Sequence, residues 1–259
     1  MTPARLLILG GTGDAIELAR AAFVRFGDRL HVTTSSAGRT RHPTPIPGEI
    51  RVGGFGGPAG LAAYLIENDF NRLIDATHPF AARISASARL ACERAQVPRL
   101  MLLRPAWRRH PLDWWIEVDN MGAAAAVVGS IGRRVWLTVG GSDIASFADV
   151  AGTHFLVRLI EPPLRPLPLA SYEVILGRGP FTLAEERRLI DRYAIDVLVC
   201  KASGGAATEA KLTAARERAL PVVMVRRPPP EPGDAVDTVA AALDWLAGSF
   251  FSPQPKRGL

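Results

Sequence analysis

The stretch Arg5-Leu6-Leu7-Ile8-Leu9-Gly10-Gly11-Thr12-Gly13-Asp14 decides how the first part of this chain folds. An apolar run, residues 6–9, stops at two glycines, and a helical pattern follows at once. This order is typical of a buried parallel strand that turns into a helix whose N-terminus faces an anion. The glycines allow a tight turn and let a phosphate approach the backbone. Ile16 replaces the last glycine of the G-x-G-x-x-G fingerprint, so a purely structural turn is the alternative.

Composition places the chain among globular α/β proteins. Its 259 residues are 48% hydrophobic but only 7% aromatic, which suits one large or two small domains. Short apolar runs alternate with helical patterns throughout, which predicts βα units and parallel sheets. No apolar run reaches the ~18 residues of a membrane span, and no signal peptide is recognisable. Cys92 and Cys200 form no disulfide framework, so we expect a cytoplasmic protein without a membrane partner.

The net charge of +6 at pH 7 indicates an acidic partner or solvated basic helix faces. The arginines are scattered, and no nucleic-acid-binding motif is present, so we expect no nucleic acid. A cleft that takes a polycarboxylate remains as the sharper interpretation. The five histidines lack metal-ligand spacing, and we expect no metal site.

Two internal similarities suggest that the chain contains related halves. Residues 135–139 run into Gly140-Gly141-Ser142-Asp143, which repeats the opening pattern of apolar strand and glycine turn. Residues 90–105 and 213–228 align without a gap, and each ends in an Arg-Pro pair. The alternative is convergence on a common βα pattern.

We therefore predict an α/β fold of two Rossmann-like parallel-sheet domains with a cleft between them. The first domain, 1–131, is expected to bind the nucleotide, and the second, 132–248, to face the substrate. Residues 249–259 are expected to form a loose tail. The gapless alignment of the two halves places His78 opposite Lys201.

The polar segment that follows the second expected strand, 30–34, favours NADPH over NADH. An NAD site usually has Asp or Glu there to accept hydrogen bonds from the ribose. This segment has hydroxyls and arginines but no carboxylate, which suits a 2′-phosphate; an ordinary polar loop is the alternative. The expected cofactor residues are Gly10, Gly11, Thr12, Gly13 and Asp14 for the pyrophosphate, Ser35, Ser36 and Arg39 for the 2′-phosphate, and Asp75, Ala76 and Thr77 for the nicotinamide side.

Other strand-end loops supply candidate catalytic and substrate-binding groups. His78 can donate a proton at neutral pH, although a helix cap or a hydrogen-bonded structural histidine fits equally. Lys201 opens a segment whose glycines and helix start form an anion nest. The candidate proton donors are thus His78, Lys201 and water, and each arginine is alternatively a solvated charge. The expected substrate-binding residues are Arg104, Arg178, Ser203, Gly204, Gly205, Thr208 and Lys211.

Four stretches together resemble the precorrin-6A reductase family of cobalamin biosynthesis. They are Gly10-Gly11-Thr12 with Asp14, Asp75-Ala76-Thr77-His78-Pro79-Phe80, Gly177-Arg178-Gly179-Pro180-Phe181 with Glu185, and Lys201-Ala202-Ser203-Gly204-Gly205 with Thr208 and Lys211. The resemblance extends to about residue 247. It implies NADPH-dependent reduction of one double bond of the anionic tetrapyrrole precorrin-6A to give precorrin-6B. A substrate with many carboxylates would also explain the basic charge.

Two other functions stay open from the sequence. One is an NADP-dependent dehydrogenase or epimerase on another anionic substrate, although the Tyr-x-x-x-Lys pair of short-chain dehydrogenases is absent. The other is a non-catalytic nucleotide-binding sensor or assembly subunit. A monomer and an association with other enzymes of the pathway are both compatible with the sequence.

Overall fold

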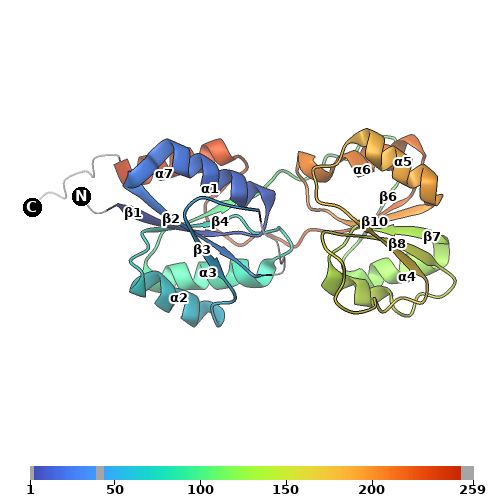
Figure 1. Cartoon of the computed structure of the whole chain (residues 1–259), viewed down its shortest axis with the longest axis horizontal. Helices are drawn as coiled ribbons and strands as arrows, with labels where there is room; N and C mark the ends of the chain where they lie inside the picture. The colour runs from blue at the N-terminus through green and yellow to red at the C-terminus, as the bar shows by residue number, and fades with distance from the viewer. Residues whose placement is uncertain (1–2, 39–43, 252–259) are drawn as a thin grey trace, which may run out of the picture. The chain divides into compact units, whose positions relative to one another are not determined.

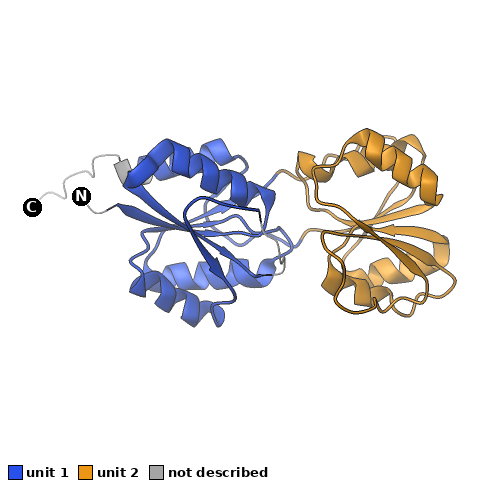
Figure 2. Ribbon diagram, in the orientation of Figure 1, with its two compact units in different colours: residues 1–104, 228–259 blue, residues 105–227 orange. Residues whose placement is uncertain are grey.

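The computed structural model describes residues 3–38 and 44–251, which form two units, each built on a parallel sheet (Figure 1). The first unit takes its described residues from Met1–Arg104 and Pro228–Leu259, and the second is Pro105–Arg227 (Figure 2). The units thus divide differently from the boundary predicted between residues 131 and 132. The chain leaves the first unit after Arg104 and returns to it at Pro228.

The sheet of the first unit has the strand order β12-β5-β4-β1-β2-β3. The order reverses at β1, which is the switch point of a doubly wound sheet, where ligands bind outside the carboxyl ends of the strands. The strands are β1 (Ala4–Leu9), β2 (Leu30–Ser36), β3 (Glu49–Val52), β4 (Arg72–Asp75), β5 (Arg99–Leu102) and β12 (Ala235–Val236).

Helices cover both faces of this first sheet (Figure 1). The helices α1 (Gly13–Phe26) and α7 (Val239–Phe251) lie on one face, and α2 (Gly57–Glu67) and α3 (Ala82–Ala95) lie on the other. Leu6 and Ile8 of β1 pack toward α1, whereas Leu7 and Leu9 pack toward α2 and α3. Burial on both faces explains why the opening strand is an unbroken apolar run.

The sheet of the second unit has the order β6-β11-β10-β7-β8-β9. Helix α4 (Met121–Ile131) covers one face, and α5 (Leu183–Tyr193) and α6 (Ala210–Glu217) cover the other (Figure 1). The strands are β6 (Trp115–Val118), β7 (Arg134–Leu137), β8 (His154–Leu159), β9 (Tyr172–Leu176), β10 (Val197–Lys201) and β11 (Val222–Val225).

The edge strands explain why the units differ from the predicted domains. β6 pairs with β11 of the second sheet, so residues 115–131 belong there and not to the nucleotide domain. β12 pairs with β5 of the first sheet, so the C-terminal segment belongs to the first unit. Helix α7 continues to Phe251, and residues 249–251 are therefore helical instead of part of the predicted tail. The rest of that tail, 252–259, lies outside the described residues.

The second glycine turn differs from the first. Gly140-Gly141 leads into the short 3-10 helix η2 (Gly141–Phe147) and not into an α-helix. A second such helix, η3 (Ala206–Thr208), precedes α6. None of the described helices is long and apolar enough to cross a membrane.

The glycine-rich entry to α2 gives a stability prediction. A Cβ at Gly60 would collide with the backbone carbonyl oxygen of Phe55. We expect Gly60→Ala to lower the free energy of unfolding by about 1 to 3 kcal/mol in urea denaturation. Gly248→Ala in α7 is the control, because a Cβ there meets nothing within 4 Å. Equal stability of Gly60→Ala and the wild type would contradict this packing.

Candidate functional site

The turn between β1 and α1 has the geometry that the opening sequence predicts. The amide of Gly10 donates to the carbonyl oxygen of Ser35 on β2, at 2.8 Å. Gly11 has a φ of +97°, which disfavours any residue with a side chain. Thr12 is the N-cap of α1, and its hydroxyl accepts from the amide of Ala15 at 3.1 Å. The predicted strand-to-helix turn is confirmed.

The glycines of this turn serve different purposes. A Cβ at Gly10 would approach Thr34 Cγ2 to 3.1 Å and Ala15 Cβ to 3.4 Å, so Gly10 is needed for internal packing. A Cβ at Gly11 or Gly13 would meet nothing within 4 Å. Gly13 therefore leaves open space beside the first-turn N–H groups of α1, where an anion can approach the backbone.

A second loop meets this turn at the end of β4. Leu9 pairs with Asp75, and the Thr12 hydroxyl donates to the carbonyl oxygen of Ala76 at 2.6 Å. The buried carboxylate of Asp75 accepts from the amide of Thr77 at 3.1 Å and from its hydroxyl at 2.7 Å. The structure therefore brings residues 10–14 and 75–77 together, and Asp75 acts by holding Thr77 in place.

The residues expected at the 2′-phosphate lie at the end of β2. Ser35 and Ser36 are its last two residues, and Ser35 is buried. Arg39 lies outside the described residues and stays a prediction. Arg51, which the sequence reasoning missed, is on the neighbouring strand β3, paired in register with Ser35.

Arg51 supports the glycine loop that follows β3. Its guanidinium lies 3.8 Å from the ring centre of Phe55 and donates to the carbonyl oxygens of Gly53 and Gly54 at 2.7 and 2.9 Å. The amide of Gly53 in turn donates to the carbonyl of Ser36 at 2.9 Å. The available sequence signal was an arginine two residues before the stretch Gly-Gly-Phe-Gly-Gly, residues 53–57.

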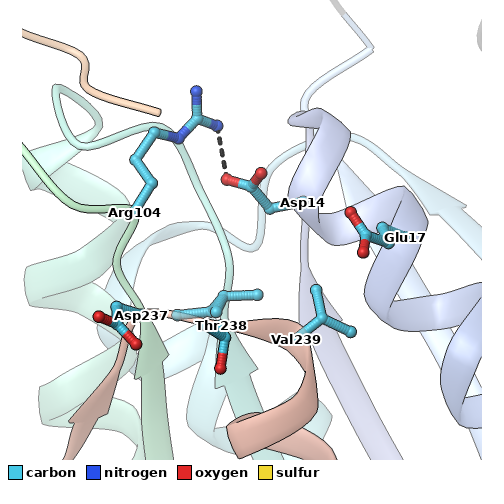
Figure 3. A pocket seen from close by; sticks show the side chains of 7 residues that line it. Asp14, Glu17, Arg104, Asp237, Thr238 and Val239 are labelled. Carbon is cyan, nitrogen blue, oxygen red and sulfur yellow. Dashed lines mark ion pairs between the residues drawn. The ribbon is translucent and has the colours of Figure 1, made fainter. Parts of the chain in front are cut away.

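Arg104 lies in the first unit, beside the glycine turn. Its guanidinium forms an ion pair with Asp14, in which Nη2 lies 2.7 Å from Oδ2 (Figure 3). The two residues line an open pocket of about 230 Å³. The other residues of its lining are Glu17, Leu102, Asp237, Thr238 and Val239.

His78 is held by the turn in which it stands. Its Nδ1 accepts from the amide of Phe80 at 3.2 Å, so in the neutral ring the proton is on Nε2. Helix α3 begins only at Ala82, with Ala81 as N-cap and no side-chain cap. The alternative that His78 caps this helix is therefore wrong. The amide of Ala81 donates instead to the His78 carbonyl, at 2.7 Å.

Lys201 and His78 do not occupy equivalent places in the two sheets. Asp75 pairs with Met101, and Cys200 pairs with Met224. If the two methionines correspond, Lys201 corresponds to Ala76, two residues before His78. The gapless alignment fails because the helical segments between these strands differ: α3 has 14 residues, whereas η3 and α6 have 3 and 8.

Lys201 joins two loops of the second unit. Its Nζ lies 2.6 Å from Oδ2 of Asp143, the aspartate that follows the second glycine turn. Side chains bind the backbone carbonyl oxygens of the loop after Lys201. Arg227 donates to the carbonyl oxygens of Ala202 and Ser203 at 3.2 and 2.7 Å, and Trp107 Nε1 donates to that of Gly205 at 2.8 Å. The carbonyl oxygens of these three residues are therefore hydrogen-bonded within the second unit.

The loop Gly177–Phe181 folds around an aromatic ring. A Cβ at Gly177 would come within 3.0 Å of the Phe181 ring. That ring lies 3.9 Å from the guanidinium carbon of Arg158, which binds the fully buried Glu186 through two hydrogen bonds of 2.9 and 2.5 Å. Sequence reasoning missed Arg158 and Glu186; the signal for Glu186 was its helical spacing from the buried Ile190.

The remaining expected substrate residues lie near these loops. Arg178 is exposed, and Thr208 is the half-buried last residue of η3. Thr182 and Glu185 form a capping box at the start of α5. Among the described residues, no three His, Cys, Asp or Glu side chains are placed to hold a metal ion.

Lys211 has a buried amine in the second unit. Its side chain is on α6, only 6% of the residue is exposed, and Nζ lies 5.2 Å from the centre of the Trp107 ring. Within the described part of the chain no carboxylate forms an ion pair with it. Burial lowers the pKa of the Lys211 ammonium, and nearby Glu186 only partly offsets this.

Comparison with known proteins gives a consistent family. A family model described as Precorrin-6x reductase CbiJ/CobK matches residues 5–247. The Precorrin-6A reductase of Rhodococcus erythropolis is 43% identical over 243 residues, 93% of this chain and 97% of that protein. The enzyme of that name from Rhodobacter capsulatus is 39% identical, covering 96% of this chain and 98% of that protein. A solved structure, CobK precorrin-6A reductase, has a TM-score of 0.90 and 38% identity, over 97% of this chain and 99% of the other.

The burial of Lys211 gives a prediction for stability against pH. The unfolded chain titrates Lys211 near the ordinary pKa of about 10.4, whereas the folded chain has a lower pKa. Between these values the unfolded state binds more protons, so the folded state loses stability as the pH falls. We expect Lys211→Met to raise the free energy of unfolding at pH 7 by about 1 to 4 kcal/mol. The gain shrinks as the pH approaches the ordinary value for lysine.

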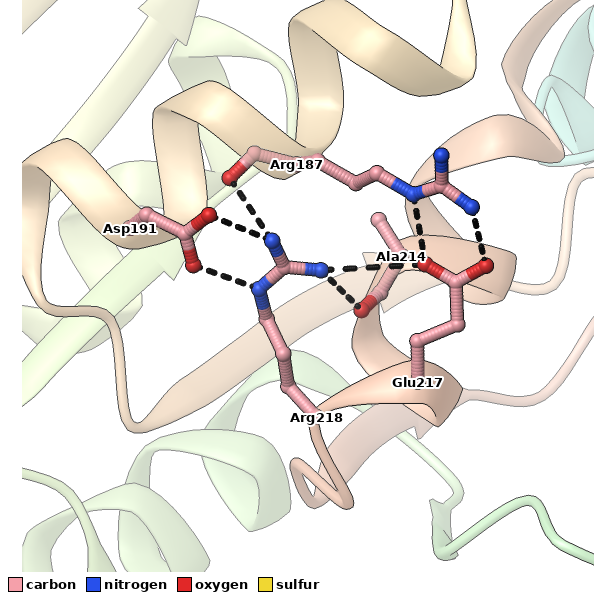
Figure 4. Close-up of polar contacts among 5 residues, drawn as sticks. All are labelled: Arg187, Asp191, Ala214, Glu217 and Arg218. Atoms are coloured by element: carbon pink, nitrogen blue, oxygen red, sulfur yellow. Dashed lines mark hydrogen bonds and ion pairs between the residues drawn. The ribbon is translucent and has the colours of Figure 1, made fainter.

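Arg187→Met is the matched control for this measurement. Arg187 lies on α5, and its Nε is 2.7 Å from Glu217 at the exposed surface (Figure 4). We expect a loss below about 1 kcal/mol, without a gain at pH 7. Urea denaturation at a series of pH values measures both variants. A Lys211→Met protein less stable than wild type at pH 7 would show that the amine is not an uncompensated buried charge.

Proposed function

The chain belongs to the Precorrin-6x reductase CbiJ/CobK family, and on that premise we propose that it reduces one double bond of precorrin-6A, with NADPH as the hydride donor, to give precorrin-6B. It is an oxidoreductase of cobalamin biosynthesis. One observation of this chain carries the cofactor part of the proposal: the open space at Gly11 and Gly13 beside the N-terminus of α1. That space fits a pyrophosphate, because backbone N–H groups and the helix dipole meet there.

The strand order supports one orientation for NADPH. β2 and β4 lie on opposite sides of β1, so a dinucleotide with its pyrophosphate at α1 has one half over each neighbour. We assign the 2′-phosphate end to β2, with Ser35, Ser36 and Arg39, and add Arg51 of β3 as a nearby guanidinium. The nicotinamide end then lies over β4, at Asp75, Ala76 and Thr77. Asp14 contributes its backbone, because Arg104 engages its carboxylate.

The second unit supplies groups for the carboxylates of the substrate. Lys201 is kept in place by Asp143, and the clamped loop that follows contains Ser203, Gly204 and Gly205, which we assign to the substrate. A rigid loop loses little entropy on binding, which favours affinity. The further residues that we assign to the substrate are Arg178, Thr208, Lys211 and, from the first unit, Arg104.

The reduction needs a hydride and a proton. Bound NADPH supplies the hydride, and the protein orients the reactants and holds developing charge. His78 is one candidate proton donor, and it would act in its imidazolium form. In the neutral ring, Nδ1 accepts from the Phe80 amide and Nε2–H can donate a hydrogen bond to developing charge. Lys201 is the second candidate donor. We also propose a cytoplasmic location, which the two buried free thiols, Cys92 and Cys200, support.

Turnover with precorrin-6A tests the proposed function. We expect the wild type to oxidise NADPH only when precorrin-6A is present, and to use NADH less efficiently. Arg39→Ala is expected to weaken NADPH binding while leaving NADH binding unchanged, because only NADPH carries the 2′-phosphate. No NADPH oxidation above background would refute the reductase assignment. Unchanged NADPH affinity in Arg39→Ala would refute the 2′-phosphate site.

Gly13→Val tests the pyrophosphate site separately. The new side chain fills the space beside the first turn of α1, so we expect NADPH affinity in calorimetry to fall at least about tenfold, or 1.4 kcal/mol. We expect the free energy of unfolding to change by less than about 1 kcal/mol, because valine is a better helix former than glycine and a Cβ at this position meets no neighbour. Gly248→Val is the control, since it adds the same bulk at another open glycine. Normal NADPH binding by Gly13→Val would exclude this site.

A further inference from the structure

Lysine is much rarer than arginine in this chain. Among 31 lysine and arginine residues only three are lysine: Lys201, Lys211 and Lys256. Arginine stays protonated in proteins, whereas a lysine that is buried can lose its proton. A lysine at the buried position 211 is therefore a titratable cation in a protein that otherwise uses permanent ones.

The charges around Lys211 balance only when its amine is neutral. Glu186 faces it from α5, but this carboxylate already binds Arg158 of β8 through two hydrogen bonds. Cys200 faces it from β10, and burial raises the pKa of that thiol to about 11, so the thiol is neutral at pH 7. Protonated Lys211 therefore leaves one unbalanced positive charge in a buried cluster, which is costly without an anion.

Trp107 connects this amine to the clamped loop. One face of the Trp107 ring is 5.2 Å from Lys211 Nζ, and its indole N–H donates to the carbonyl oxygen of Gly205. The amine is thus adjacent to the loop that we assign to the substrate. The Lys211 side chain is more than nine-tenths buried and has no ion-pair partner among the described residues. Trp107 contacts both its amine and the glycine loop.

We propose that Lys211 binds a carboxylate side chain of the substrate and takes up one proton from solvent as it does so. The neutral amine, a solvent proton and the carboxylate give an ammonium–carboxylate pair, and no covalent bond forms or breaks. An entering carboxylate supplies the missing negative charge, which favours the protonated amine. The inference rests on the proposed function, because precorrin-6A supplies the carboxylate.

The rarity of lysine makes the titration directly measurable. Full-length protein labelled with [ε-13C]lysine has only three side-chain signals. The signal that is lost in Lys211→Met belongs to Lys211. Should that variant not fold, Lys201→Met and Lys256→Met assign the signal by elimination. In the free protein we expect the Lys211 signal to titrate below the ordinary lysine pKa of about 10.4, because the amine is buried.

Adding precorrin-6A without NADPH then tests the proposal. We expect the titration of Lys211 to move up by at least about one pH unit, equivalent to a tenfold change in proton affinity. Lys211→Met is expected to bind precorrin-6A at least tenfold more weakly and NADPH with unchanged affinity. Arg187→Met, with its exposed ion pair on α5 (Figure 4), is expected to keep both the shift and the affinity.

The outcomes separate this inference from the proposed function. If the wild type oxidises NADPH with precorrin-6A but saturating precorrin-6A leaves the Lys211 titration unchanged, the inference is overturned and the reductase stands. If the protein neither binds precorrin-6A nor oxidises NADPH with it, both are overturned. An upward shift that is retained in Arg187→Met supports the inference.

Discussion

The hydroxyl of Thr12 makes the hydrogen bond on which the first unit's site depends. It accepts from the Ala15 amide and thereby caps α1, and it donates to the carbonyl of Ala76 at the end of β4. A single side chain thus fixes where the helix begins and ties its N-terminus to the neighbouring strand end. Because Gly10 is bound to Ser35 on the other side, the turn is anchored to both β2 and β4. The open space at Gly13 has a defined shape for that reason, and a pyrophosphate would meet a preorganised backbone.

The second unit is organised around buried charge. Arg158, Glu186 and Lys211 lie on the α5/α6 face of its sheet, and aromatic rings contact both cations. The close approach of the Phe181 ring explains Gly177, and the contact with Arg158 explains Phe181. A sequence motif that reads as a binding loop is therefore partly a structural support for an ion pair. Within the described part of this cluster, no carboxylate forms an ion pair with Lys211, and the proposed role of the unit toward an acidic substrate rests on this residue.

The sequence predicted the features that are set by local rules. The buried strand before Gly10 and the N-terminal turn of α1 each depend on a few consecutive residues. Features set by distant pairing were not predictable from it. The edge strand β12 pairs with β5, although the whole second unit lies between these two strands in the sequence. No local sequence pattern indicates this pairing. The Arg158–Glu186 pair likewise joins a strand and a helix 28 residues apart. For the candidate site, the sequence located the loops at the ends of β2, β4 and β10, whereas it did not point to Arg51 or to the side chains that position these loops.

The proposed function depends on hydride transfer from NADPH to the tetrapyrrole. NADPH carrying deuterium on the transferable position of its nicotinamide would be incubated with the wild-type protein and precorrin-6A, and the product analysed by mass spectrometry. We predict a reduced tetrapyrrole that contains one deuterium from the cofactor, together with NADP⁺ that has lost it. A reduced product without deuterium from either face of the nicotinamide, or a cofactor that keeps its label, would contradict the assignment.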